Sequence, residues 1–222
     1  GKSAMVDGGK LSDHARKLIA GYLDLAPSLT AFGNTVPTSF LRLVPHQEAP
    51  TNICWGDQNR SVLVRVPLGW LGVADMVKDA NPQETEHGPP PDGSQTVEFR
   101  CPDGSANVHF LLAGLAVAAR HGLEMPGALE LAEKLYVSVN IFAPEHKALQ
   151  QELPQLPASC SESADRLLKD RAIYEKDDVF SPRLIDGIVK QLKSYDDEGL
   201  SERFYGKGSE IQTLVERYLH CS

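Results

Sequence analysis

The stretch that decides the fold reads TVEFRCPDGSANVHFLLAGLAVAA and spans residues 96–119. From Thr96 to Cys101 apolar and charged residues alternate, which predicts a β-strand. The chain becomes helical from Ala106 onward, and the residues from Val108 to Ala119 are apolar almost all round, which predicts a buried helix. With strands in the front half of the chain and helices in its tail, we predict an α+β fold.

The two charged side chains of this strand are predicted to share one face. Successive side chains of a strand point to opposite faces, so Glu98 and Arg100 lie on the same side. A guanidinium group presents a fork of donors that matches the oxygens of carboxylate and phosphate groups. The pair therefore fits a metal ligand beside an anion clamp, but spacing alone also fits a solvent-facing ion pair that contributes little.

Two further β-prone runs precede this strand, at Asn52–Trp55 and Ser61–Pro67. The turn-rich residues Gly56–Arg60 join them, which predicts a β-hairpin. Arg60 at the turn and Arg65 between two valines add positive charge where a strand is normally apolar. These arginines are therefore candidates for binding an anion together with the later strand.

Helices are predicted on both sides of the strands. Ser12–Leu25 has apolar residues at helical spacing, with Ser12 as its N-cap. Ser159 and Glu162 form a possible capping box, Ser181 precedes a proline at the first helical position, and Ser209 opens a terminal amphipathic helix. Between the strands, the polar residues Asn81–Ser94 are rich in proline and glycine and predict a mobile surface loop.

The composition restricts the kinds of partner. The 222 residues carry a formal net charge of -8, which argues against a sequence-independent nucleic-acid surface. An anionic ligand stays possible because a few arginines can dominate a cleft. The longest apolar run is too short to cross a bilayer, the four scattered cysteines fit a reducing compartment, and the first residues form no signal-peptide core. We therefore expect a cytoplasmic protein with no nucleic-acid or membrane partner.

Three segments resemble motifs of the glutamine synthetase family. Arg42–Pro50 resembles R-L-V-P-G-x-E-A-P, Asn59–Pro67 resembles N-R-S-x-x-x-R-x-P, and Glu98–Asn107 resembles E-x-R-x-P-D-x-x-x-N. The motifs stand in the family's order and at comparable spacing. The chain thus looks like the C-terminal part of a glutamine synthetase catalytic domain.

The resemblance implies a fold and a domain organisation. Residues 1–145 would be the C-terminal part of the catalytic domain, with antiparallel active-site strands packed with helices. Residues 146–222 would be a helical C-terminal region of the same domain. The family's N-terminal domain and its E-x-E and H-x-H metal-binding segments would lie upstream of Gly1, so this chain would carry about half of a site. The full-length protein would be a homo-oligomer.

The resemblance also implies a reaction. Glutamine synthetases use ATP to join glutamate and ammonia through γ-glutamyl phosphate, with two divalent metals. By this resemblance ATP, glutamate and ammonia would be substrates of the full-length protein. Glu98 would be a ligand of Mg²⁺, or of Mn²⁺ in its place.

The other site residues take their implied roles from the same motifs. Arg42 and Arg100 would hold the carboxylates of glutamate. Glu48 would lie on a flap that shields the acyl phosphate and helps deprotonate ammonium. Arg60 would stabilise the phosphoryl group in transfer and contact ATP, and Arg65 would bind ATP phosphates. All of these arginines, with Glu98, are predicted to converge on one concave face.

Some positions depart from the family pattern and keep other functions open. His46 replaces a glycine, Thr38–Arg42 replaces N-S-Y-K-R, and Thr96 stands where many bacterial members have an arginine that contacts ATP. One alternative is a γ-glutamyl ligase that acts on an amine or polyamine, and another is a non-catalytic protein that binds a nucleotide or regulator. Tyr136 lies where bacterial members carry a tyrosine that can be adenylylated, and the sequence leaves open whether it is modified.

Overall fold

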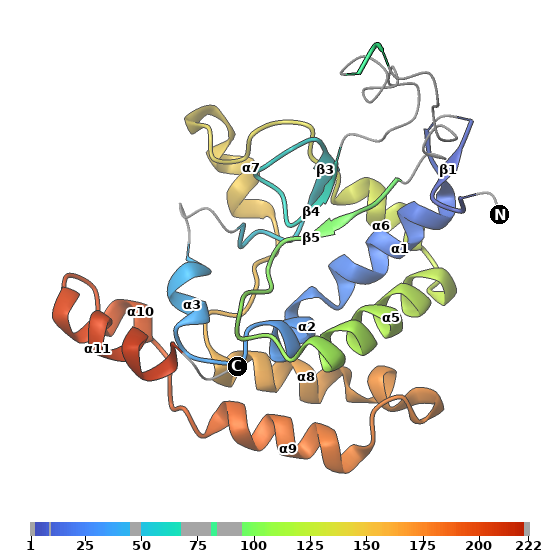
Figure 1. Cartoon of the computed structure of the whole chain (residues 1–222). Helices are drawn as coiled ribbons and strands as arrows, with labels where there is room; N and C mark the ends of the chain where they lie inside the picture. Colours follow the sequence, from blue (N-terminus) through green and yellow to red (C-terminus); the bar gives the residue numbers. More distant parts are fainter. Residues whose placement is uncertain (1–2, 9, 45–49, 68–80, 84–94, 220–222) are drawn as a thin grey trace.

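The computed structural model describes residues 3–8, 10–44, 50–67, 81–83 and 95–219 (Figure 1). Its strands are β1 (Val6–Asp7), β2 (Lys10–Leu11), β3 (Trp55–Asp57), β4 (Val64–Val66) and β5 (Glu98–Phe99). Its helices are α1 (Asp13–Asp24), α2 (Ala26–Gly33), α3 (Ser39–Arg42), α5 (Val108–Glu124), α6 (Ala128–Lys134), α7 (Lys147–Glu152), α8 (Cys160–Glu175), α9 (Pro182–Lys193), α10 (Leu200–Arg203) and α11 (Gly208–Tyr218), with 3-10 turns at Pro144–His146 and Lys176–Asp178. Glu48 and most of the predicted mobile loop, residues 84–94, lie outside the described residues.

Helices α1 and α5 pack closely because glycines meet where they cross. A Cβ atom added to Gly21 would lie 2.0 Å from the carbonyl oxygen of Ala118, and one added to Gly122 would lie 2.1 Å from that of Lys17. Only glycine allows two helix backbones to approach this closely. The start of α1 agrees with the prediction, since Ser12 Oγ accepts a hydrogen bond of 3.1 Å from the amide of Ala15.

Replacing Gly122 by alanine is expected to destabilise the protein strongly. The new methyl group would meet backbone atoms, which cannot rotate away, so the helices must separate at a cost of about 3 kcal/mol or more. For a domain of this size the melting temperature should fall by roughly 6–12 °C. Gly187→Ala in α9 is the matched control, because a Cβ there meets no atom within 4 Å and alanine favours a helix. Equal melting temperatures for the two variants would contradict this crossing.

Helices α2 and α8 pack against each other and form a second layer. Ser28 Oγ lies 2.9 Å from the hydroxyl of Tyr174, and Thr30 Oγ1 lies 2.6 Å from Ser163 Oγ, all within the buried contact. These pairs satisfy polar groups that would be costly to bury alone. Beside them the ring of Phe32 lies against Tyr174, with centroids 5.3 Å apart. The core is thus continuous between residues 1–145 and 146–222, and the boundary between these parts stays a prediction.

The predicted starts at Ser159 and Ser181 are confirmed, whereas α11 begins at Gly208 with Lys207 as its N-cap, so Ser209 does not open it. The amide of Glu162 donates to Ser159 Oγ over 3.0 Å, and the Glu162 carboxylate accepts in return from the amide of Ala158 over 2.9 Å. The amide of Leu184 donates to Ser181 Oγ over 3.3 Å. These contacts satisfy orphan donors in the first turn of each helix.

The predicted β-hairpin is wrong. Strands β3 and β4 are parallel, with Trp55 opposite Val64, and β5 pairs antiparallel with β4. After the turn at residues 58–62, the chain runs back to the start of β3, where the amides of Leu63 and Val64 both donate to the carbonyl of Cys54 over 3.1 Å. Asn59 in this turn is bonded to Val137 and Val139, so the turn does not close a hairpin.

The predicted buried helix at Val108–Ala119 is only partly buried. Val108 and Leu112 are each 60% exposed, whereas Val117 and Ala118 on the opposite side are buried against α1. The sequence shows an apolar helix but not which of its faces is covered. Among the described residues, no helix is long and apolar enough to cross a membrane.

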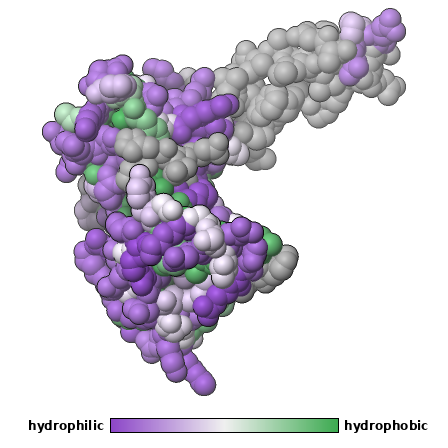
Figure 2. All heavy atoms as spheres, turned by 90° about the vertical axis from the view of Figure 1, so that its left-hand side faces the viewer, coloured by the Kyte–Doolittle hydropathy of each residue, from purple (hydrophilic) through white to green (hydrophobic). Residues whose placement is uncertain are grey.

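The small sheet rests on α1, where the rings of Tyr22 and Phe99 are 6.0 Å apart. Helices α10 and α11 lie at the other side of the molecule, to the left in Figure 1. Figure 2 turns that side toward the viewer, and hydrophilic residues cover most of it with small hydrophobic areas between them. Helix α11 is amphipathic, as predicted, but none of its residues is buried.

Candidate functional site

The pairing of β4 with β5 brings two oppositely charged side chains together. Arg65 lies opposite Glu98 in the antiparallel ladder, and residues opposite one another in a ladder project to the same face. Arg65 Nη2 lies 2.8 Å from Glu98 Oε2, and Arg100 Nε lies 3.4 Å from Glu98 Oε1. The Glu98 carboxylate is thus held between two guanidinium groups, and the predicted common face of Glu98 and Arg100 is confirmed.

Arg100 is fixed by the turn that carries Arg60. Its Nη1 donates to the carbonyl oxygens of Arg60 and Val62, the latter over 3.1 Å, and its amide donates to the carbonyl of Leu63 over 3.1 Å. Burial lowers the pKa of the Arg100 guanidinium, Glu98 opposes this shift, and the nearby charges of Arg65 and Arg60 add to it. Arginine still stays protonated, so positive charges crowd together here and an anion would relieve their repulsion.

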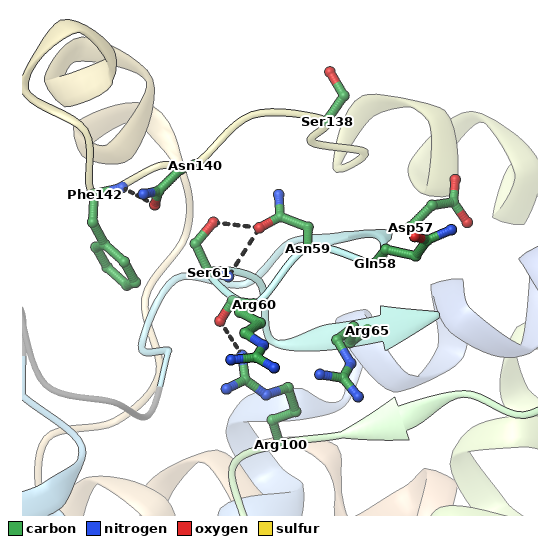
Figure 3. A pocket seen from close by; sticks show the side chains of 10 residues that line it. All are labelled: Asp57, Gln58, Asn59, Arg60, Ser61, Arg65, Arg100, Ser138, Asn140 and Phe142. Atoms are coloured by element: carbon green, nitrogen blue, oxygen red, sulfur yellow. Dashed lines mark hydrogen bonds between the residues drawn. The ribbon is translucent and has the colours of Figure 1, made fainter. Parts of the chain in front are cut away.

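These arginines line a pocket of about 750 Å³. Figure 3 shows the side chains of Arg60, Arg65 and Arg100 gathered beneath the turn that carries Asn59 and Ser61. The lining residues are Asp57, Gln58, Asn59, Arg60, Ser61, Arg65, Arg100, Ser138, Asn140 and Phe142. Within the part of the chain that the structure describes, Arg60 forms no ion pair. A positively charged pocket thus forms in a chain whose net charge is negative.

The opposite wall of the pocket consists of residues that the sequence did not single out. Ser138, Asn140 and Phe142 come from the segment after α6. This segment runs beside β3, where the amide of Val137 donates to the carbonyl of Trp55 over 2.8 Å. No local sequence pattern predicts that this segment lies beside β3, because about 80 residues separate the two in the chain.

Tyr136 lies at the edge of this wall. It is 39% exposed, its hydroxyl donates to Asp57 Oδ2 over 3.2 Å, and its ring lies edge-on to Trp55 with centroids 4.9 Å apart. Burial raises the pKa of the Tyr136 hydroxyl, and the nearby Asp57 carboxylate adds to this shift. The hydroxyl is therefore neutral at pH 7.

Arg42 lies outside the pocket of the other three arginines. It donates through Nη2 to the carbonyl oxygens of Cys101 and Pro102, which bound the segment after β5. It lines a second pocket of about 270 Å³ together with Asp103 and residues of α11. Backbone carbonyls thus hold this guanidinium outside the pocket of Arg60, Arg65 and Arg100, although its charge still acts on Arg100. The predicted common face is confirmed for those three arginines and stays a prediction for Arg42.

The described residues do not by themselves fit a metal ion. Within the described ranges, no group of three or more His, Cys, Asp or Glu side chains is placed to hold one. Both oxygens of Glu98 already face guanidinium groups, and a lone carboxylate binds Mg²⁺ weakly. A metal at Glu98 would need further ligands from other residues.

Comparison with known proteins identifies a family and several relatives of this chain. Residues 1–203 match the family model described as glutamine synthetase, catalytic domain. The chain is 35% identical over 176 residues to a glutamine synthetase of Streptomyces coelicolor, which covers 79% of this chain and 32% of the relative. It is 32% identical over 211 residues to a glutamine synthetase of Pyrococcus furiosus, which covers 94% of this chain and 42% of the relative.

The fold is also shared with a solved structure. The cryo-EM structure of Plasmodium falciparum glutamine synthetase superposes with a TM-score of 0.62 at 21% identity, and the match covers 88% of this chain and 42% of that chain. The predicted α+β architecture is therefore confirmed. The chain spans about a third to two-fifths of the length of the curated relatives it matches.

Proposed function

Because the chain belongs to the glutamine synthetase family, we propose that it forms the C-terminal part of an ATP-dependent ligase that joins ammonia to glutamate. In this reaction the γ-phosphoryl group of ATP passes to the γ-carboxylate of glutamate, and ADP leaves. Ammonia then displaces phosphate from the γ-glutamyl phosphate to form glutamine. The substrates, the homo-oligomeric assembly and the cytoplasmic location of the full-length protein are all part of this proposal.

The observation that carries the proposal is the pocket of Arg60, Arg65 and Arg100. Negative charge spreads over the phosphoryl oxygens during transfer, and fixed cations aimed at those oxygens lower the barrier. Arg65 and Arg100 are preorganised by Glu98, and the carbonyl of Arg60 holds Arg100. Arg60 is exposed and makes no ion pair within the described residues, so it is the cation best placed to meet an incoming phosphoryl group.

The other assigned roles also belong to the proposal. Arg42 and Arg100 would bind carboxylates of glutamate, and Glu48 would shield the acyl phosphate. Glutamine synthetases generally use a divalent metal, and Glu98 would contribute one ligand to Mg²⁺ or Mn²⁺. Since the described residues lack the remaining ligands, the chemistry proposed for this chain is anion binding and charge stabilisation.

A first test measures anion binding by the 222-residue chain with inorganic tripolyphosphate, in titration calorimetry without metal. The unsubstituted chain should bind, and binding should weaken with added salt because the contacts are ionic. Glu98→Gln should bind about threefold to tenfold more tightly, because it removes the charge that neutralises Arg65 and Arg100. Glu133→Gln is the control, since Glu133 pairs with Arg16 outside the pocket. Equal affinities for Glu98→Gln and Glu133→Gln would contradict the assignment of the pocket.

A second test separates the amine acceptors. The full-length ligase would be assayed for phosphate release with ATP, Mg²⁺ and glutamate, with ammonium or a panel of amines and polyamines as the acceptor. Turnover that depends on ammonium supports the proposal. Turnover only with an organic amine would replace it by a γ-glutamyl amine ligase, and no turnover with any acceptor would favour a binding protein.

A further inference from the structure

The turn that carries Arg60 is fastened to a distant segment of the chain by the side chain of Asn59. Asn59 Nδ2 donates to the carbonyl oxygens of Val137 and Val139, over 3.1 and 2.8 Å. Asn59 Oδ1 accepts from the amide and the hydroxyl of Ser61, over 2.9 and 2.7 Å. Both donors and both acceptor positions of the amide are thus used, which leaves the Asn59 side chain a single orientation.

Ser61 bonds the other side of the same turn to the same distant segment. Its hydroxyl accepts from the amide of Ile141 over 3.1 Å, and the residue is 5% exposed. Arg60 therefore lies between two residues that are both bonded to residues 137–141. Figure 3 draws the bonds between Asn59 and Ser61 on either side of Arg60. Its own guanidinium forms no ion pair among the described residues, so its position depends on the backbone that these neighbours hold.

The same contacts extend to the other cations of the pocket. The carbonyl of Arg60 accepts from Arg100 Nη1, and Arg100 Nε pairs with Glu98. A shift of the Asn59 turn would therefore move the Arg60 side chain, whereas Arg100 would keep its contacts with the carbonyl of Val62 and with Glu98. The hydrogen-bonded chain runs without a break from residues 137–141 to the sheet.

We propose that Asn59 is a positioning residue that holds Arg60 against bound phosphate groups. This inference rests on the proposed function, because it assumes that the pocket binds phosphate. Asn59 acts through Arg60, and its loss should cost nothing further once Arg60 has been removed.

The test is a double-mutant cycle, with the Kd for inorganic tripolyphosphate measured on the 222-residue chain. Arg60→Ala and Asn59→Ala should each weaken binding about tenfold. The double variant should bind about as weakly as Arg60→Ala alone, whereas independent effects would multiply to about a hundredfold. A role in stability alone would not make the two effects overlap in this way.

Asn52→Ala is the matched control. Asn52 is a buried asparagine that, like the partly buried Asn59, donates to a backbone carbonyl, that of Gln150 over 2.8 Å, but it lies outside the pocket. It should lower the melting temperature and leave the Kd unchanged. If Asn59→Ala does not fold, Ser61→Ala replaces it in the cycle, since it removes the hydroxyl that bonds to Asn59 and Ile141.

The outcomes are distinct. Binding by the unsubstituted chain with overlapping effects supports the positioning role. Binding with independent effects overturns the positioning role and leaves the phosphate pocket in place. Failure of the unsubstituted chain to bind tripolyphosphate overturns both.

Discussion

The 222-residue chain by itself is expected to form no glutamine from ATP, Mg²⁺, glutamate and ammonium. Phosphoryl transfer with two metals needs both ions on a fixed template. Within the described ranges no set of three metal-binding side chains exists, and Glu98 is already paired with Arg65 and Arg100. The chain should thus bind phosphate groups without transferring them.

The measurement is glutamine formation by the purified chain, with an intact glutamine synthetase as the positive control. An Arg60→Ala version of the chain, purified in the same way, reveals contamination by host enzyme, because contaminating activity would be equal in both preparations. Sustained glutamine formation that disappears in Arg60→Ala would show that the chain holds a complete site.

In the full-length ligase, Arg60→Ala is expected to lower kcat by about 100-fold to 1000-fold. Arg60 is proposed to meet the charge that develops on the phosphoryl oxygens in the transition state, and the loss of one such donor typically has this effect. The KM for glutamate should change little, because this guanidinium is proposed to contact phosphate groups and not glutamate. Steady-state kinetics of the purified variant give both constants.

Arg16→Ala is the control for this substitution. Arg16 pairs with Glu133 on the surface, over 2.8 Å and outside the pocket, so its loss should leave kcat unchanged. The melting temperature of Arg60→Ala should also change little, because Arg60 is exposed. A kcat within a few-fold of the unsubstituted enzyme would contradict the proposed role of Arg60.

The features predicted correctly from the sequence are those set by neighbouring residues. Ser12, Ser159 and Ser181 cap helices because a short hydroxyl side chain satisfies amides within the next turn. The common face of Glu98 and Arg100 follows from the period of a strand. In each case the residues that interact are a few positions apart.

The features that the sequence did not predict depend on partners far along the chain. The predicted hairpin is wrong because the side-chain amide of Asn59 donates hydrogen bonds to the carbonyls of Val137 and Val139. No sequence pattern near Asn59 predicts these partners. Arg42 lies outside the pocket because the carbonyls of Cys101 and Pro102, after β5, accept hydrogen bonds from its guanidinium. The exposure of Leu112 depends on which helices reach α5, and composition alone does not determine that.

The distribution of the pocket along the chain limits how it can be transferred or shortened. A contiguous segment that keeps every lining residue must run from Asp57 to Phe142. Residues 57–65, Arg100 and residues 138–142 supply the lining, and none of these pieces alone has the buried contacts that would order it. Bringing the two ends of the segment from Asp57 to Phe142 together costs entropy before any hydrogen bond between them forms. No short peptide motif can therefore carry this anion site to another scaffold, and recombination between relatives would preserve it only if both walls were inherited together.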